Sequence, residues 1–205
     1  MKKQKENQRG RSMIEMMGYI AVVMTLTVSI GYIISKAYGD YKYSKASLQL
    51  TDLANSITKA GAIEANYADI VTMINTKDNK EGFNMIPSTY RVKDSEGGRT
   101  IHHAFGGSVT IGHPGSDTTK FAVTFNNLSR NQCIELAMKD WMHNKYIDLF
   151  SITVNGTQWN WPAYKTVNSG DYVLPIKRSE VAGTGVGSEG VCTDLISNSI
   201  MWVFN

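Results

Sequence analysis

The stretch Gly10-Arg11-Ser12-Met13-Ile14-Glu15 decides the architecture of this chain, because it opens a run from Met16 to Ile34 that contains no charged residue. About 20 apolar residues in a helix span a bilayer, so this run is just long enough to cross one. Glu15 stands at its edge, and an ionised carboxylate at the centre of a bilayer costs about 2.5–3.5 kcal/mol. We therefore expect a membrane-spanning helix and a functional use for Glu15.

Before Gly10 lies a short basic leader that accounts for the charge of the whole chain. The formal net charge is +3, and the leader carries Lys2, Lys3, Lys5 and Arg9 against the single acid Glu6. Because basic residues stay on the cytoplasmic side of a membrane helix, the domain that follows is predicted to lie across the membrane. Residues 11–205 carry no net charge, which removes the main electrostatic support for nucleic-acid binding.

An alternative for the apolar run is a secretory signal peptide that is removed from the mature protein. Such a signal has an apolar region of about 7–15 residues, followed by small residues at its cleavage site. The run from Met16 to Ile34 is longer, and Ser35-Lys36-Ala37 is a poor cleavage site. A retained helix is therefore the preferred interpretation.

The order of basic leader, glycine, four residues, glutamate and apolar run resembles the processing site of type IV prepilins. In that family a membrane peptidase cuts after the glycine and methylates the new amino terminus. The resemblance implies cleavage between Gly10 and Arg11, which makes Glu15 the fifth mature residue. The family usually begins its mature chain with an apolar residue, and this chain departs from that pattern at Arg11.

The same resemblance implies an assembly role for Glu15. In the family this glutamate meets the free amine of a neighbouring subunit inside the fibre, and a buried carboxylate does need a paired cation. Cleavage would create that amine at Arg11, whose guanidinium offers a second partner. The alternative is that Glu15 lies at the level of the lipid headgroups, where its charge costs little.

The helix is predicted to continue beyond the membrane, from about Ser12 to Ala60, with Gly61 as its end or a kink. Apolar residues recur at three- and four-residue spacing, which indicates a helix that packs on something. They are Tyr43, Ala46, Leu50, Leu53, Ile57 and Ala60. The polar face is assigned to Asp40, Lys42, Lys45, Gln49, Asp52, Asn55 and Lys59. A short second helix is expected over 66–76, through Ile70, Val71 and Ile74.

From Ile86 onward the pattern changes to strands and turns, which gives an α+β fold class with the long helix laid on an antiparallel sheet. Ser129-Arg130-Asn131-Gln132 is a capping-box pattern that opens a helix through Cys133, Leu136, Ala137 and Trp141. Strands are expected at 108–111, 121–125, 148–154 and 199–204. Turns are expected at 113–116 and at Asn155-Gly156, with a glycine-rich loop from Gly183 to Gly190.

Cys133 and Cys192 lie in the part of the chain assigned to the oxidising side of the membrane. A pair of cysteines there favours a disulfide, and two buried thiols are the alternative. This half also resembles the type IVb pilins, in which a short helix holds the first cysteine of a disulfide loop and a last strand follows the second. The resemblance rests on Phe125-Asn126-Asn127-Leu128, Val154-Asn155-Gly156 and Ile200-Met201-Trp202-Val203-Phe204.

No pattern of catalytic or metal-binding residues is present in the sequence. His102-His103, His113 and His143 lack metal-ligand spacing with cysteines or acids, and paired histidines in a loop are usually solvated. Gly185-Val186-Gly187-Ser188-Glu189-Gly190 matches a dinucleotide fingerprint in letters but lacks a βαβ context, so a surface loop is expected. We expect no enzyme, no cofactor and no metal.

The sequence therefore predicts a structural subunit of a type IV pilus, made as an inner-membrane precursor and assembled into an extracellular fibre for adhesion or self-association. The predicted parts are a leader over 1–10, a transmembrane half-helix over 11–39 and a globular domain over 40–205. The expected partners are other copies of the chain, the membrane before assembly, a prepilin peptidase and an inner-membrane platform with a cytoplasmic ATPase; no nucleic acid is expected. A minor pilin, a type II secretion pseudopilin and, more remotely, a membrane-anchored periplasmic enzyme are the alternatives.

Overall fold

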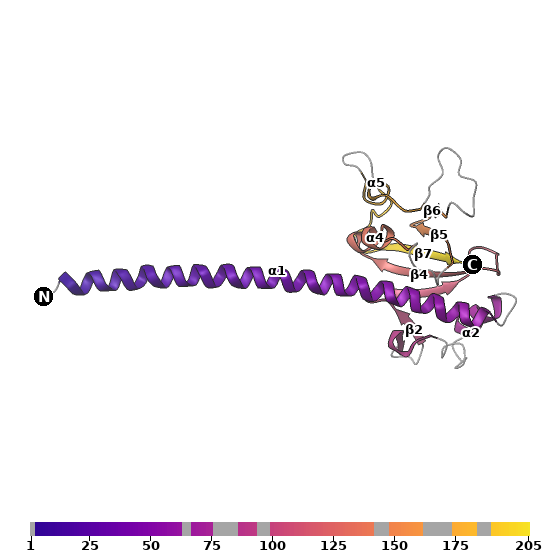
Figure 1. Cartoon of the computed structure of the whole chain (residues 1–205), viewed down its shortest axis with the longest axis horizontal. Coiled ribbons are helices and arrows are strands. Elements are labelled where there is room, and N and C mark those ends of the chain that lie inside the picture. Colours follow the sequence, from indigo (N-terminus) through magenta and orange to yellow (C-terminus); the bar gives the residue numbers. More distant parts are fainter. Residues whose placement is uncertain are drawn as a thin grey trace. The chain divides into compact units, whose positions relative to one another are not determined.

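The structure, a computed structural model, describes residues 3–62, 67–75, 86–93, 99–141, 148–161, 174–183 and 190–205 (Figure 1). The chain divides into two compact units, Met1–Lys42 and Tyr43–Asn205. Helix α1 (Lys3–Gly61) begins earlier than predicted, inside the basic leader, and ends at the predicted glycine. The part of it from Met13 to Gly61 is long and apolar enough, by length and composition, to cross a membrane.

Gly61 is the last residue of α1, and a side chain at this position would have no room. A Cβ atom built on Gly61 would lie 2.1 Å from the Cε1 atom of Tyr67. Tyr67 in turn packs its ring on Phe121, with the ring centroids 4.8 Å apart. The missing side chain thus lets the Tyr67 ring reach the core directly beside the helix end.

The stripe predicted for the second half of α1 is confirmed, since Ala46, Leu50, Leu53 and Ile57 are all at most 1% exposed. The predicted polar face of this half was wrong at Gln49. Gln49 is 1% exposed, and its Nε2 atom donates a hydrogen bond of 2.7 Å to the carbonyl oxygen of His102. Gln49 lies three residues after Ala46 and four before Leu53, so it shares their face of the helix.

Short helical segments follow α1. Helix α2 (Ala68–Asn75) buries Ile70, Val71 and Ile74, as predicted. A 3₁₀ turn, η1 (Ser88–Tyr90), leads into the first strand. The Tyr90 hydroxyl donates to the Asp52 carboxylate at 2.8 Å, which ties this turn to α1.

Within the described residues, seven antiparallel strands form one sheet in the order β1-β2-β3-β4-β7-β5-β6. Their bounds are β1 (Arg91–Lys93), β2 (Arg99–His102), β3 (Ser108–Gly112), β4 (Phe121–Leu128), β5 (Leu149–Val154), β6 (Thr157–Asn160) and β7 (Asn198–Phe204). The α+β fold with a long helix and an antiparallel sheet is confirmed. The sequence pattern did not predict β1, β2 or β6.

Strand β7 lies between β4 and β5 and carries the centre of the core (Figure 1). Trp202 is fully buried, and its ring meets those of Phe125 and Trp141 edge-on at 5.1 Å and 5.4 Å between centroids. Phe204 stacks on Phe121 at 5.1 Å. Aromatic pairs at these distances contribute beyond the area that they bury, so the two strands β4 and β7 form the rigid centre of the domain.

The turn between β5 and β6 is the predicted Asn155-Gly156 turn. Both residues have positive φ, 46° at Asn155 and 88° at Gly156. Two consecutive residues of positive φ match the twist of a two-residue hairpin, and asparagine and glycine adopt them at the lowest cost. The hairpin then places Val154 opposite Thr157.

Helix α4 (Arg130–Ala137) begins with the predicted capping box. The Ser129 hydroxyl accepts from the Gln132 backbone N–H at 3.4 Å, and the Gln132 side chain accepts from the Ser129 N–H at 2.9 Å. The helix is shorter than predicted, because it stops before Trp141. The Trp141 indole N–H donates to the Leu136 carbonyl at 3.0 Å, so the ring folds back over the helix end.

Helix α5 (Arg178–Ala182) was not predicted, and it precedes the glycine-rich loop. Residues 184–189 of that loop lie outside the described residues, so only Gly190 of the glycine motif is described. His143 also lies outside them. The ends of the loop approach closely, since a Cβ atom on Gly190 would lie 2.3 Å from the Val181 carbonyl oxygen.

Candidate functional site

The first half of α1 exposes every large apolar side chain that it carries. Between Met13 and Ile34 these side chains are 41% to 74% exposed, with Val23 the least and Val28 the most. Single exposed apolar residues are common on soluble proteins, but a continuous apolar surface of this extent marks a contact with a membrane or with other proteins. This helical surface is therefore the first candidate site.

Hydroxyl groups inside the apolar half are bonded to their own helix. Thr25 Oγ1 donates to the Val22 carbonyl at 2.8 Å, Thr27 Oγ1 to Val23 at 2.8 Å, and Ser29 Oγ to Thr25 at 2.7 Å. A polar group without a partner costs several kcal/mol in hydrocarbon. These internal bonds let the three residues enter an apolar environment without that cost.

Small residues interrupt the same surface. A Cβ atom added at Gly18 or at Gly31 would meet no atom within 4 Å. Glycines on an apolar helix let another helix approach its backbone closely. The surface can therefore receive a neighbouring helix as well as lipid.

Glu15 lies in α1 at the edge of this surface and is exposed. The backbone of Gly10 and Arg11 also lies within α1. Each turn of helix holds about 3.6 residues, so the predicted cleavage point lies little more than one turn before Glu15. A carboxylate on an exposed apolar helix has its charge available to a partner brought by another molecule.

A disulfide joins Cys133 to Cys192, with their Cα atoms 6.0 Å apart and a sequence separation of 59. Both residues are fully buried. Cys133 lies in the first turn of α4, and the Cys192 N–H donates to the Val181 carbonyl at 2.9 Å, so the bond ties α4 to the end of α5. The pairing agrees with the one expected for a type IVb-like chain.

His103 corrects the expectation that the paired histidines are solvated, because it is only 3% exposed. Its ring stacks on Phe125 at 5.1 Å between centroids. Nε2 contacts the Asn126 carbonyl oxygen at 2.8 Å, and Nδ1 accepts from the Phe105 N–H at 3.3 Å. The ring is therefore a neutral core residue with Nε2 protonated, rather than a metal ligand.

The hairpin between β2 and β3 holds this ring in a space that a glycine leaves open. A Cβ atom on Gly107 would lie 2.4 Å from His103 Nε2 and 2.2 Å from the Asn126 carbonyl oxygen. Burial lowers the pKa of His103, and the charge of His102 lowers it further, against the Asn126 hydrogen bond. The burial of His103 could not be predicted from the sequence, because it depends on Phe125 of β4, which stacks on the imidazole ring.

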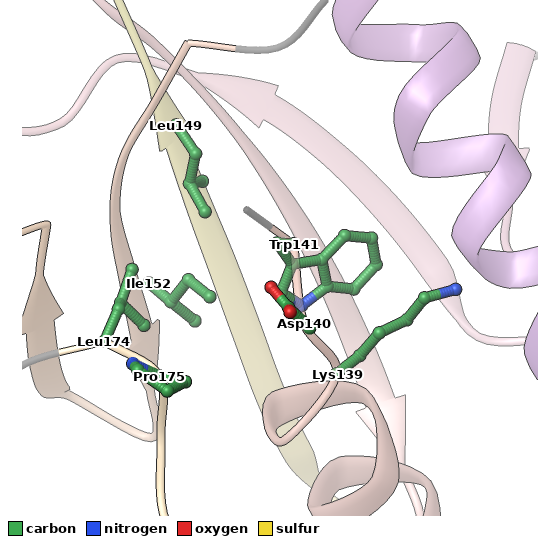
Figure 2. Close-up of a pocket in the computed structure, with 7 residues that line it drawn as sticks. All are labelled: Lys139, Asp140, Trp141, Leu149, Ile152, Leu174 and Pro175. Carbon is green, nitrogen blue, oxygen red and sulfur yellow. The ribbon is translucent and has the colours of Figure 1, made fainter. Parts of the chain in front are cut away.

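Figure 2 shows a small pocket whose lining residues are Lys139, Asp140, Trp141, Leu149, Ile152, Leu174 and Pro175. Its volume is about 10 Å³, which is room for about one water molecule. The described residues also contain no group of three or more histidines, cysteines and acids that could hold a metal ion. This pocket is too small for a substrate.

The family model described as PilS N terminal matches residues 40–201 of the chain. The chain belongs to this family of type IV pilins. The prediction of the family is confirmed, and a type IV pilin is a structural subunit rather than an enzyme. The match covers the globular unit, so the leader and the membrane half rest on the residues described above.

Two solved pilins are similar to the chain. One is a type IVb pilin from Salmonella typhi, with 16% identity, a TM-score of 0.45, and coverage of 78% of this chain and 97% of that one. The other is TcpA, a type IV pilin from Vibrio cholerae El Tor biotype, with 14% identity, a TM-score of 0.41, and coverage of 80% and 98%. The chain has no match among curated proteins.

Proposed function

We propose that this pilin is made as a prepilin, cleaved after Gly10 and polymerised into a type IV pilus. The precursor lies in the bacterial inner membrane with its leader in the cytoplasm, and the assembled fibre is extracellular. Membership of the pilin family supports the fibre, and the basic leader with Gly10 and Glu15 supports the cleavage. The proposed membrane insertion and polymerisation follow from the apolar side chains that α1 exposes between Met13 and Ile34.

The observation that carries the proposal is the apolar half of α1, all of whose large apolar side chains are exposed. Before assembly, lipid covers the side chains between Met13 and Ile34. In a fibre, the same side chains of neighbouring copies cover one another, so the apolar surface stays out of water in both states. Gly18 and Gly31 leave room for the close approach that such packing needs.

Glu15 selects the position of each incoming subunit. Cleavage frees an amine at Arg11, and the carboxylate of a subunit already in the fibre pairs with that amine. In low dielectric an unpaired charge is costly, whereas a paired and hydrogen-bonded one is tolerated. A subunit placed one step out of register would leave both charges unpaired, so the pair favours a single axial position.

The partners follow from the same pathway. A prepilin peptidase cuts the leader, and an inner-membrane platform driven by a cytoplasmic ATPase moves each subunit from lipid into the fibre. The disulfide between Cys133 and Cys192 suits a domain that works outside the cell, where thiols are oxidised. The globular domains coat the fibre, and their surfaces between the two cysteines serve adhesion or self-association.

Intact mass of the membrane-extracted protein tests the first step. We expect a chain that begins at Arg11, with or without one added methyl group, because that cut removes the whole basic leader and places Glu15 fifth. A mature chain that begins near Tyr38 would mean a removed signal peptide and would contradict the proposal. The amount of the chain in sheared surface fibres then distinguishes a major pilin from a minor pilin or a pseudopilin.

A further inference from the structure

Two large apolar side chains stand out from the globular unit beside the disulfide. Leu195 is 80% exposed and Ile196 is 73% exposed. They lie in the segment between Cys192 and β7, and we call this pair the apolar projection. A single exposed apolar residue is common on a protein surface and needs no explanation. Two adjacent ones point to a contact if the backbone around them is held in place.

The backbone on both sides of the apolar projection is fixed by Asn198, whose side chain is fully buried. Its Nδ2 atom donates to the Asp194 carbonyl at 2.6 Å and to the Leu128 carbonyl at 3.0 Å, and its Oδ1 accepts from the Asp194 N–H at 3.3 Å. The Leu195 carbonyl accepts from the Arg130 N–H at 3.3 Å. The pair is therefore presented in water by a preformed segment, which lowers the entropy cost of binding.

A groove of about 240 Å³ lies on the same globular unit, between α1 and the residues that follow α4. Its lining residues are Ser44, Ser47, Leu48, Thr51, Lys139, Asp140 and Trp141. Leu48 is 58% exposed at this groove, although Leu50, Leu53 and Ile57 of the same half of α1 are buried. We call this the Leu48–Trp141 groove.

Two of the three hydroxyl groups on the α1 side of the groove are already bonded. Ser47 Oγ donates to the Tyr43 carbonyl at 2.9 Å, and Thr51 Oγ1 donates to the Ser47 carbonyl at 3.1 Å. A polar group that keeps its hydrogen bond can be covered without the cost of an unpaired donor. The groove can thus accept apolar side chains, although several of its residues are polar.

The apolar projection and the groove lie at opposite ends of α4. The Arg130 N–H at the start of this helix bonds Leu195, and Lys139 and Trp141 follow its end at Ala137. Eight helical residues separate the two ends by about 12 Å. A surface feature and a complementary pocket at different places on one molecule make a head-to-tail contact between copies, which extends into a fibre.

The groove carries one acid, Asp140, and one base, Lys139, and Figure 2 shows their charged ends pointing apart, which leaves the Lys139 ammonium to face an acid beside the apolar projection. Asp194 is exposed next to the apolar projection. At the groove, the Lys139 ammonium lies 5.3 Å from the centroid of the Trp141 ring, and Figure 2 shows its side chain reaching toward α1. Lys139 is an exposed residue, but partial burial of its side chain lowers its pKa, so a carboxylate brought to it would favour the charged ammonium.

We propose that Leu195 and Ile196 of one copy insert into the Leu48–Trp141 groove of the next copy, with Asp194 facing Lys139. This inference rests on the proposed polymerisation and names one contact between globular domains in the fibre. It adds to the contacts between the apolar halves of α1, and it sets the direction in which successive domains follow one another.

Charge exchange in the full chain tests the contact, with the yield of sheared fibres as the measurement in cells that assemble this pilin. Lys139→Asp and Asp194→Lys should each lower fibre yield about tenfold, because like charges then face each other. The double variant should recover to within about twofold of the unaltered chain. Lys59→Asp, the same charge change at another exposed position of the globular unit, should leave the yield unchanged.

A second variant tests the apolar part. Leu195→Ser with Ile196→Ser should lower fibre yield at least as much, while the membrane-extracted protein keeps its Cys133–Cys192 bond and its resistance to trypsin. A double charge variant that assembles no better than the single variants would overturn the contact. Normal fibres from the serine variant that no longer attach to a surface would assign the apolar projection to adhesion instead. Absence of fibres from the unaltered chain would overturn the proposed function, and this inference with it.

Discussion

The two halves of helix α1 differ in whether the chain itself covers their apolar residues. The half from Met13 to Ile34 is apolar on all sides and exposes its large side chains by 41% or more. The half from Tyr43 to Gly61 is amphipathic, and its Leu50, Leu53 and Ile57 are at most 1% exposed under the domain's own sheet. The comparison shows that a helix apolar all round needs partners from outside the chain, whereas a helix with one apolar stripe needs only its own domain.

The largest effect should come from Glu15→Ala in the outward-facing half. We expect fibre assembly to fail, because an incoming amine at Arg11 loses its partner, while membrane insertion stays intact or improves after removal of a charge. Electron microscopy of the cells and the amount of sheared fibre measure the outcome.

Thr25→Ala is the matched control for this change, since it removes a polar group from the same half without removing a charge. The Thr25 hydroxyl bonds only within the helix, to Val22. Thr25→Ala cells should make fibres. Normal fibres from Glu15→Ala cells would remove the assembly role of the carboxylate.

The two halves should respond differently to the same leucine truncation. Leu53→Ala should lower the free energy of unfolding of the globular unit by about 2–5 kcal/mol, because it leaves a cavity in the core. Leu26→Ala, at a side chain that is 57% exposed, should leave this free energy unchanged. Denaturant unfolding of the full chain in detergent, followed by tryptophan fluorescence, measures both. Equal losses would mean that the halves are not distinct.

A smaller loss is expected at the edge of the buried stripe. Gln49→Ala removes the 2.7 Å hydrogen bond to the His102 carbonyl and leaves that acceptor unpaired, which costs about 1–3 kcal/mol. Lys45→Ala, at an exposed position one turn earlier, should change stability by less than about 0.5 kcal/mol. If the two variants melt at the same temperature, water replaces the Gln49 donor.

The smallest expected effect depends on pH and arises at His103. Its pKa is lowered below the ordinary value of 6.5 in the folded chain, chiefly by burial. The unfolded chain therefore takes up the proton first, so stability is complete above about pH 6.5 and falls as the pH drops through the folded pKa. His103→Gln keeps a donor for Asn126 without a titrating ring, and its melting temperature should fall less between pH 7 and 5. His102→Gln, at a partly buried position of the same hairpin, should retain most of the fall, because burial and not the charge of His102 is the main cause of the lowered pKa.

The sequence predicted what depends on neighbours along the chain. The three- and four-residue spacing from Ala46 to Ile57, the capping box at Ser129–Gln132 and the Asn155-Gly156 turn each set a local geometry, and the structure has all three. The position of Gln49 was missed because its burial depends on a carbonyl 53 residues away. Trp141 was assigned to a helix because its spacing suits one, but its indole N–H bonds back to Leu136 after the helix ends.

Some parts of the candidate site could likewise be predicted from the sequence, and others could not. The apolar half of α1 and the cysteine pair follow from composition and compartment, and they were predicted. The buried state of His103 was not, since it is set by Phe125 of β4 and by the space that Gly107 leaves. The Leu48–Trp141 groove was not predicted either, because it joins two segments about ninety residues apart that only the folded domain brings together.

The place of β7 in the sheet makes the core depend on the last strand described. Strands β4 and β5 both pair with β7, which comes last among the described strands in chain order. Without residues 198–204, the two parts of the sheet have no strand to join them, and Trp202 is missing from the core. Under the export proposed above, a chain that stops short of β7 would lack the strand that completes its sheet. Strand order would then act as a check on completeness before a subunit enters a fibre.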